Sequence, residues 1–114
     1  MQLNFIKKNR EFRYIYNHGE SLANKYLVCY KHPKREEHPR FGVSISGKVG
    51  HAVVRNKIKR QIKEILREFY DVISEDYDII FIVRVRCNEA DFQQIRKSTY
   101  DILKRQKLIV RKQS

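Results

Sequence analysis

The chemistry most visible in this sequence is the neutralisation of phosphate by closely spaced positive side chains. Residues 48–67 contain seven cations and a single acid, Glu64. With a helical step of about 100° per residue, Arg55, Lys59 and Lys63 recur on one side of a helix. Like charges four residues apart cost helix stability unless an anion offsets them. The segment therefore predicts a helix that binds a polyanion.

The same segment carries an apolar stripe that would hold these cations in place. Its members recur at helical spacing and are Ile58, Ile62, Ile65, Leu66 and Phe69. Because the two stripes adjoin around the axis, the pattern predicts a helix over about residues 52–72 that packs on a core and exposes its basic side at the rim. The alternative is a solvated charged face, but such faces usually mix opposite charges four residues apart.

The composition of the whole chain agrees with a nucleic-acid partner. It has 25 Lys and Arg against 13 Asp and Glu in 114 residues, which gives a net charge of +12 and a pI near 9.9. Clustered basic residues at such a pI are typical of nucleic-acid-binding proteins, although a membrane surface also attracts cations. The length suits one RNA-binding domain that spans residues 1–114.

No segment predicts a membrane span, a signal peptide or a disulfide. The chain lacks a run of about 18 apolar residues, and no apolar stretch follows the cations Lys7, Lys8 and Arg10. Cys29 and Cys87 lie far apart in apolar surroundings, without a C-x-x-C pair. They are predicted to be free, buried thiols of a cytoplasmic protein.

The residue types that catalyse hydrolysis are not grouped anywhere in the sequence. The histidines are scattered without metal-ligand spacing, at positions His18, His32, His38 and His51. The acids stand where loops, caps and helix ends favour them. A glycine-rich phosphate cradle and a G-x-S-x-G motif are both missing. We therefore expect no catalytic residue and no tightly bound metal in this chain.

Apolar periodicity predicts the elements that precede the basic helix. Asn9 is placed to cap a first helix that ends near Gly19. Alternating residues over 25–31 and 41–46 predict two strands. The polar, proline-bounded segment 32–39 between them predicts a β-hairpin connection.

The second half of the chain predicts a central strand and a last helix. Residues 79–83 form a continuous apolar run, typical of a strand in the middle of a sheet. Asn88 is the predicted cap of the last helix, with Asp91 at its third position. The basic tail over about residues 108–114 is predicted to fray. The predicted fold class is α+β, in the order α-β-β-α-β-α, with helices packed on a central sheet.

One segment resembles the signature of a known family. From Val49 to Lys63 the chain reads V-x-x-A-x-x-R-N-K-I-K-R-x-I-K. This pattern is similar to the signature of the bacterial ribonuclease P protein subunit, and element order, length and charge agree over nearly the whole chain. Two positions depart from it: Lys57 stands where the family commonly has arginine, and Gly47 where many relatives carry a second lysine.

The resemblance implies a small protein that joins a large catalytic RNA and helps it to remove the 5′ leader from precursor tRNA. Mg²⁺ would be held by the RNA. The resemblance also implies a left-handed β-α-β crossover through the basic helix, against the usual right-handed preference. That helix would face the RNA through Lys48, Arg55, Asn56, Lys57, Lys59, Arg60, Lys63 and Arg67. Asn56 is a neutral donor for a 2′-hydroxyl or a base edge, or else for a backbone group of the protein itself.

The second surface that the resemblance implies is a cleft between the basic helix, the first helix and the sheet, which would take the single-stranded leader. Phe12 and Tyr16, one helical turn apart, match its aromatic positions together with Tyr30. Flat side chains hold single strands by stacking on their bases. The alternative is that these rings fill the core, and for Phe12 both interpretations stay open.

Three further residues complete the predicted cleft. Ser44 and Ser46, on the small-residue face of the second strand, would form a floor shallow enough for a nucleotide. Arg84 interrupts the apolar character after the central strand. It would either meet a phosphate or make a salt bridge at the edge of the sheet.

Two other functions remain open from the sequence. A ribosomal protein or another structural RNA binder would share the charge and the crossover fold, but it would not need the signature together with the aromatic cleft. A DNA-binding or membrane-surface module would not continue its apolar stripe into a sheet core. The expected partners are therefore the catalytic RNA and precursor tRNA, with no membrane and no DNA.

Overall fold

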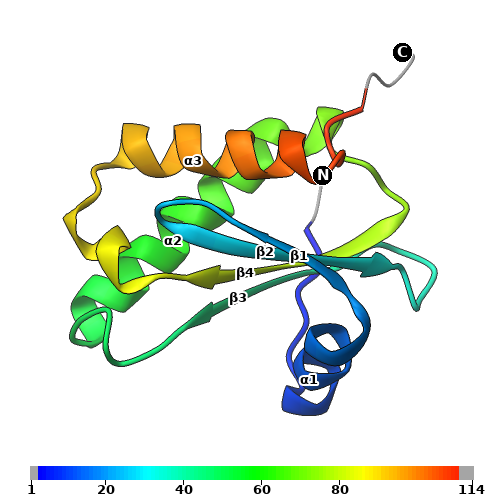
Figure 1. Ribbon diagram of the computed structural model, residues 1–114, viewed down its shortest axis with the longest axis horizontal. Helices are drawn as coiled ribbons and strands as arrows, with labels where there is room; N and C mark the ends of the chain where they lie inside the picture. Colours follow the sequence, from blue (N-terminus) through cyan, green and yellow to red (C-terminus); the bar gives the residue numbers. More distant parts are fainter. Residues whose placement is uncertain (1–2, 111–114) are drawn as a thin grey trace.

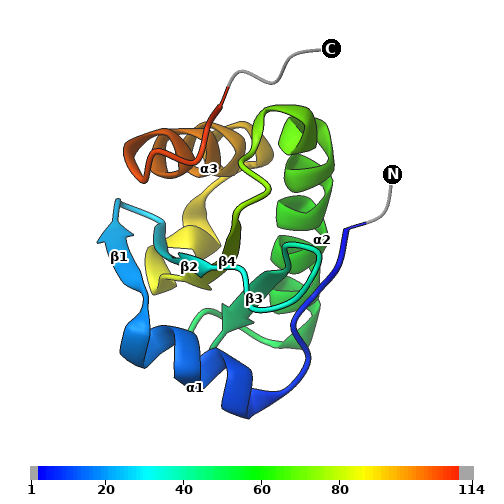
Figure 2. The ribbon, with the colours of Figure 1, turned by 90° about the vertical axis from the view of Figure 1, so that its right-hand side faces the viewer.

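The computed structural model describes residues 3–110, which form a four-stranded sheet with helices on both faces. The elements, in chain order, are α1 (Asn9–His18), β1 (Glu20–Ala23), β2 (Leu27–Pro33), β3 (Phe41–Ile45), α2 (Ala52–Phe69), β4 (Tyr77–Val83) and α3 (Phe92–Arg105). Short 3-10 helices follow α2, at Tyr70–Val72, and β4, at Val85–Glu89. α1 lies against one face of the sheet, and α2 and α3 lie against the other (Figures 1 and 2). The predicted α+β class is confirmed.

The strand order is β1-β2-β4-β3, so β4 lies between β2 and β3. β4 pairs antiparallel with β2 and parallel with β3. The central position predicted for 79–83 is confirmed, and Ile79, Ile80 and Phe81 are fully buried. The predicted hairpin between 25–31 and 41–46 is wrong. The apolar run of β4 buries both its faces and pairs both its edges when another strand lies on each side, and here these strands are β2 and β3. The segment that connects β2 to β3 must therefore cross the end of β4.

The strand β1 was not predicted from the sequence. Its four residues pair antiparallel with β2 at the edge of the sheet, and three of them are exposed. An exposed edge strand of this length carries no alternation of apolar and polar residues, which is the signal that identifies strands. The observed order is therefore α-β-β-β-α-β-α, with one strand more than expected.

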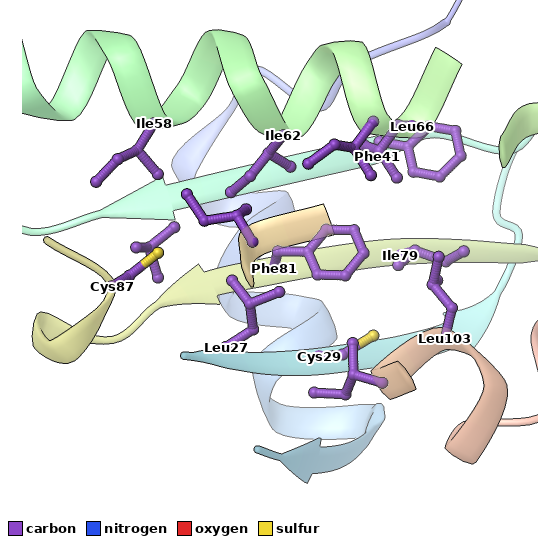
Figure 3. Close-up of a cluster of buried hydrophobic side chains, with 14 of the residues drawn as sticks. Leu27, Cys29, Phe41, Ile58, Ile62, Leu66, Ile79, Phe81, Cys87 and Leu103 are labelled. Atoms are coloured by element: carbon purple, nitrogen blue, oxygen red, sulfur yellow. The ribbon is translucent and has the colours of Figure 1, made fainter. Parts of the chain in front are cut away.

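The apolar stripe of α2 packs on the sheet as predicted. Ile58, Ile62, Ile65 and Leu66 are buried against residues of β4 and β2, among them Phe81 (Figure 3). Phe69 at the end of the helix is only partly buried. α2 connects β3 to its parallel neighbour β4, and this is the connection that the family resemblance predicts to be left-handed. A helix with one apolar stripe on this core must expose the opposite side, where the cations lie.

Both helix caps expected from asparagine are wrong. α1 has Lys8 at its N-cap with Asn9 already helical, and no side chain caps it. α3 is capped by Asp91, which forms a reciprocal capping box with Gln94. Asn88 lies in the preceding 3-10 helix, which delays the start of α3 by several residues. Asp91 and Gln94 satisfy two backbone donors at once, which favours this start over one at Asn88.

The helix α1 ends at Gly19 as predicted, and the reason is a close approach of backbones. A Cβ atom on Gly19 would lie 2.7 Å from the carbonyl oxygen of Ile15 and 2.8 Å from that of Lys31. Any larger residue would therefore push the end of α1 away from β2. This contact fixes how α1 leaves the sheet.

The start of the C-terminal tail is docked, in contrast to the predicted fraying. Leu108 is buried, and its carbonyl oxygen accepts a hydrogen bond from the amide of Ser74 at 2.8 Å. The amide of Val110 donates to the carbonyl oxygen of Val72 at 2.6 Å. The apolar side chains at 108–110 pack this segment on the core. The prediction of fraying relied on the basic composition of the tail and did not weigh these side chains. The rest of the predicted tail, 111–114, lies outside the described residues.

Candidate nucleic-acid interface

A groove of about 670 Å³ lies between α1, β3 and α2. Its lining consists of Phe5, Ile6, Lys7, Asn9, Phe12, Arg13, Tyr16, Val43, Ser44, Ile45, Lys59 and Lys63. Four of these side chains are cationic, and the lining contains no acid among the described residues. The groove lies where the cleft was predicted, and we call it the leader groove after the ligand that the family resemblance implies for that cleft. Of the predicted residues it brings together Phe12, Tyr16, Ser44, Lys59 and Lys63.

One wall of the leader groove is aromatic and belongs to α1. The ring centroids of Phe12 and Tyr16 are 6.2 Å apart, and the ring of Tyr30 lies 5.0 Å from that of Tyr16. Burial raises the pKa of the Tyr16 hydroxyl above its usual value, while a hydrogen bond with Ser44 acts in the opposite direction. Tyr30 itself is not part of the lining and supports Tyr16 from β2.

Phe12 serves both the core and the groove. It packs with a small buried cluster of Ile6, Ile15 and Ile80, yet it is only partly buried and also lines the groove. Its ring presses on the backbone of β3, where a Cβ atom on Gly42 would lie 2.8 Å from it. A glycine at this position lets the ring lie close against the strand, so the aromatic wall reaches the groove floor.

The opposite wall is cationic and comes from α2. Lys59 is exposed, and Lys63, which is half buried, places its Nζ 4.7 Å from the ring centroid of Phe5. Phe5 and Lys7 belong to the segment that runs alongside β3 before α1 begins, and Arg13 belongs to α1 (Figure 2). Sequence reasoning missed these three residues. Arg13 could have been found as the neighbour of Phe12, but nothing local marks Phe5 as part of the site.

The outer side of α2 continues this basic surface away from the groove. Asn56, Lys57, Arg60 and Arg67 are exposed, and Arg55 is half buried with an Nε that has no hydrogen-bond partner. In the part of the chain that the structure describes, no ion pair joins a cation of α2 to an acid. The first turn of α2 also lacks acidic residues. The helix therefore presents uncompensated positive charge to solvent.

Of the six residues predicted for the cleft, Tyr30, Ser46 and Arg84 lie outside the groove lining. Ser46 accepts a hydrogen bond from the amide of Lys48 at 3.3 Å, so both belong to the turn between β3 and α2. The guanidinium of Arg84 points toward the opposite edge of the sheet and donates to the carbonyl oxygen of Asn24 at 2.7 Å. Among the described residues Arg84 forms no salt bridge, so the predicted edge salt bridge is absent and a backbone carbonyl takes its place.

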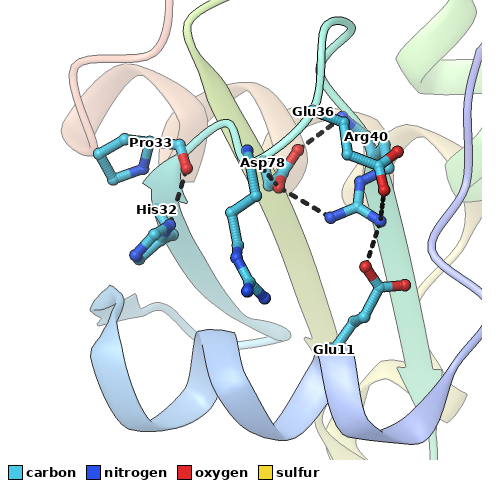
Figure 4. A network of polar contacts seen from close by, with 7 residues as sticks. Glu11, His32, Pro33, Glu36, Arg40 and Asp78 are labelled. Carbon is cyan, nitrogen blue, oxygen red and sulfur yellow. Dashed lines mark hydrogen bonds and ion pairs between the residues drawn. The ribbon is translucent and has the colours of Figure 1, made fainter.

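A buried polar network fixes α1, and with it the aromatic wall, to the sheet. Arg40 donates to Glu11 of α1 at 2.6 Å and to Asp78 of β4 at 3.2 Å (Figure 4). Asp78 is fully buried and also accepts from the backbone amide of Arg40 at 2.9 Å. The hydrogen bond from Arg40 lowers the pKa of Glu11 below its ordinary value, against the opposing effect of burial. The network was not predicted from the sequence, because no local motif indicates it.

Among the described residues, neither cysteine is activated and no metal cage is found. Burial raises the pKa of Cys29 to about 12 and that of Cys87 to about 11, so both thiols stay protonated near neutral pH. No three His, Cys, Asp or Glu side chains come together in residues 3–110 in a way that fits a resident Mg²⁺. Within the same residues, no helix has the length and apolar character that crossing a bilayer requires.

Comparison with known proteins identifies the family of this chain. The family model for Ribonuclease P matches residues 2–107. The chain belongs to the ribonuclease P protein family. It is 46% identical over 97 residues to the ribonuclease P protein component of Desulforamulus reducens, covering 85% of this chain and 86% of the relative. It is 46% identical over 101 residues to that of Clostridioides difficile, covering 88% and 89%.

Solved structures of the ribonuclease P protein family share this fold. The RNase P protein of Staphylococcus aureus superimposes with a TM-score of 0.87 at 38% identity, covering 95% of this chain and 99% of that one. The RNase P protein of Thermotoga maritima gives a TM-score of 0.81 at 33% identity, covering 90% and 96%. The chain is thus a protein subunit of ribonuclease P that takes part in tRNA processing, and the ribosomal alternative is not favoured.

Proposed function

We propose that this subunit binds the catalytic RNA through α2 and holds the 5′ leader of precursor tRNA in the leader groove while the RNA removes that leader. The observation that carries the proposal is the groove itself, where aromatic rings face cations and no acid intervenes among the described residues. Rings and cations together are what a single-stranded nucleic acid requires, since bases stack on the former and phosphates approach the latter.

The division of labour between the two surfaces follows from their shapes. The outer side of α2 is convex and carries exposed cations such as Lys57 and Arg60, which suits the phosphate backbone of a folded RNA. The groove is hollow and partly apolar, which suits unpaired nucleotides whose bases can turn toward the protein. Lys59 and Lys63 border both surfaces, so the leader would lie directly beside the catalytic RNA.

The chemical step is assigned in this proposal to the RNA and its Mg²⁺ ions. Hydrolysis of a phosphodiester needs metal ions on the attacking and leaving oxygens, and this chain has no carboxylate cluster to hold them among its described residues. The protein contributes positive charge, which allows two polyanions and their ions to approach each other. The free, buried thiols of Cys29 and Cys87 support a reducing compartment, so we place this assembly in the cytoplasm.

Leader binding is tested by comparing two tRNA ligands on the assembled enzyme. Replacing Tyr16→Ala should weaken binding of precursor tRNA with a single-stranded leader by roughly 1–3 kcal/mol, because one stacking surface is removed. Mature tRNA has no leader, so its dissociation constant should stay the same. Tyr16→Phe keeps the ring and should retain most of the affinity. Tyr100→Ala, on the distant helix α3, is the matched control and should change neither ligand.

The outcome that contradicts the proposal is equally specific. If Tyr16→Ala weakened precursor and mature tRNA by the same factor, the ring would not act on the leader. If Tyr16→Ala lost its cooperative thermal unfolding, Tyr16 would be a core residue. Tyr16→Phe, which keeps the ring, would then decide between a role in the core and a role in leader binding.

A further inference from the structure

The strand β3 has an edge whose backbone groups are not paired over its whole length. The amide of Ile79 in β4 donates to the carbonyl oxygen of Arg40 at 3.0 Å, so even-numbered residues of this segment direct their backbone groups toward β4. Phe41 faces the other way. Its amide donates to Asn4 and its carbonyl oxygen accepts from Ile6, both at 2.8 Å. The alternation of a strand therefore directs the amide and carbonyl of Val43 and Ile45 away from β4 as well.

The neighbour that pairs with Phe41 does not continue along this edge. After Ile6 the chain turns away and enters α1 at Asn9. Val43 and Ile45 both line the leader groove, and no residue of the described part of the chain pairs with their outward backbone groups. The groove floor thus offers a row of alternating donors and acceptors. The pairing at Phe41 demonstrates that this edge accepts an extended strand.

The residues around this edge determine what kind of ligand fits it. Ser44, which lies between Val43 and Ile45, lines the same groove as Tyr16, so a base stacked on Tyr16 would lie beside the free edge. The charged side chains in the groove lining are all cations, so no acid of the lining repels a phosphate. A peptide strand could also pair with a free edge, but four cations without an acid favour a polyanion.

We propose that the outward backbone groups of Val43 and Ile45 hydrogen-bond the Watson–Crick edges of unpaired leader bases. This inference rests on the proposed function, since it names the groups that recognise the leader in the same groove. Every base presents a donor beside an acceptor on that edge, so a backbone edge accepts all of them. A base-paired leader has already used those groups. The groove therefore selects for single-stranded leaders without selecting a particular sequence.

Hydrogen exchange of single amides tests this without any mutation. The full-length protein is mixed with a short single-stranded RNA oligonucleotide, and amide exchange is followed by NMR with and without it. The amides of Val43 and Ile45 should exchange about tenfold more slowly when the oligonucleotide is bound, as expected for one added hydrogen bond. Gly42 and Ser44, whose backbone groups face β4, are internal controls and should keep their exchange rates.

The same spectra separate failure of this inference from failure of the proposed function. If the oligonucleotide shifts the signals of Tyr16 and Lys59 while the exchange of Val43 and Ile45 stays unchanged, the groove binds RNA but the strand edge does not read it. If none of these signals responds at saturating oligonucleotide, both the leader groove and the edge contact are wrong.

A substitution that removes one donor provides a second test on the assembled enzyme. Val43→Pro deletes the outward amide, and proline is tolerated on an edge strand when that amide faces solvent. Val43→Ala, which keeps the amide, is the matched control for the shortened side chain. Val43→Pro should bind precursor tRNA with a single-stranded leader about tenfold more weakly than Val43→Ala, with mature tRNA unaffected.

Abasic leaders complete the test. Removing the base that meets Val43 should abolish the difference between the proline and alanine variants, because no base edge remains to be bound. A scan that places one abasic nucleotide at each leader position in turn finds this position. Equal affinity of the two variants for an intact leader would overturn the proposal, and if Val43→Pro failed to unfold cooperatively, the exchange measurement would decide.

Discussion

Arg40 is the residue on which the position of the aromatic wall depends. It connects Glu11 of α1 with the fully buried Asp78 of β4, and its own side chain is only 8% exposed. Removing one partner of a buried ionic network leaves the other charges without compensation. A change at this site therefore acts on Phe12 and Tyr16, although Arg40 does not line the groove.

The charge of Glu11 gives this network a measurable pH dependence. Because the folded-state pKa of Glu11 lies below its ordinary value of 4.5, its contribution to stability is present above pH 4.5 and is lost as the pH falls through the folded-state pKa. Glu11→Gln should lower the free energy of unfolding at neutral pH by about 1 kcal/mol. The difference from wild type should shrink below pH 4.5, where thermal melts measure it.

Glu37→Gln is the matched control for this measurement, because Glu37 is exposed on the neighbouring loop and takes no part in the network. It should leave the melting temperature nearly unchanged at every pH. A difference between Glu11→Gln and wild type that stayed constant from neutral pH to acid would mean that the charge of Glu11 is not what stabilises α1.

At the scale of elements, α2 has an apolar side that packs on the sheet and a basic side that stays exposed. Its buried isoleucines hold it on the sheet, and its cations face solvent and the groove. The two sides are separable because side chains at three and four residue spacing stay on one side of a helix. Substitutions on the basic side should therefore change RNA binding and leave the fold intact.

The triple substitution of Arg55, Lys59 and Arg60 by alanine tests the basic side. Affinity for the catalytic RNA should fall, and the slope of log affinity against log salt should flatten by about one for each phosphate that the variant no longer neutralises. Replacing Lys97, Lys104 and Arg105 of α3 removes the same charge from another helix and should flatten the slope less. An unchanged slope in a folded α2 variant would show that this stripe does not bind the RNA.

At the scale of the whole molecule, the feature that bears on the proposed role is the net charge of +12. Cations that neutralise phosphates replace part of the ionic screening that two RNAs otherwise need. The charge is spread over a chain that holds no metal cage among its described residues. The protein should therefore alter the ion requirement of the reaction without carrying out the reaction.

This division predicts two activity measurements. Purified protein without RNA should not cleave precursor tRNA at any Mg²⁺ concentration, and metal-dependent cleavage by RNA-free protein would contradict the assignment of the chemistry to the RNA. Added to the catalytic RNA, the protein should lower the Mg²⁺ concentration needed for half-maximal cleavage. The α2 triple variant is the control, and its effect on the Mg²⁺ requirement should be smaller.

The sequence by itself determined the features that are local to one element. The two stripes of α2 follow from the spacing of its residues, the central position of β4 from its unbroken apolar run, and the α+β class from the order of such patterns. The aromatic pair on α1 follows from the one-turn spacing of Phe12 and Tyr16. Periodicity is sufficient here because the backbone geometry of a helix or strand fixes which side chains share a face.

Only the tertiary structure decided which elements meet. Periodicity states that a face is apolar but not what covers it, so β3 was paired with β2 although β4 lies between them. For the same reason, periodicity did not predict three further contacts. These are the segment around Phe5 in the groove wall, the hydrogen bond of Arg84 to Asn24, and the network of Arg40 with Asp78 and Glu11. These contacts join residues far apart in the sequence, and their free energies depend on all competing arrangements of the chain. The chain's own pattern therefore specified the basic and aromatic faces, and folding alone brought them together around one groove.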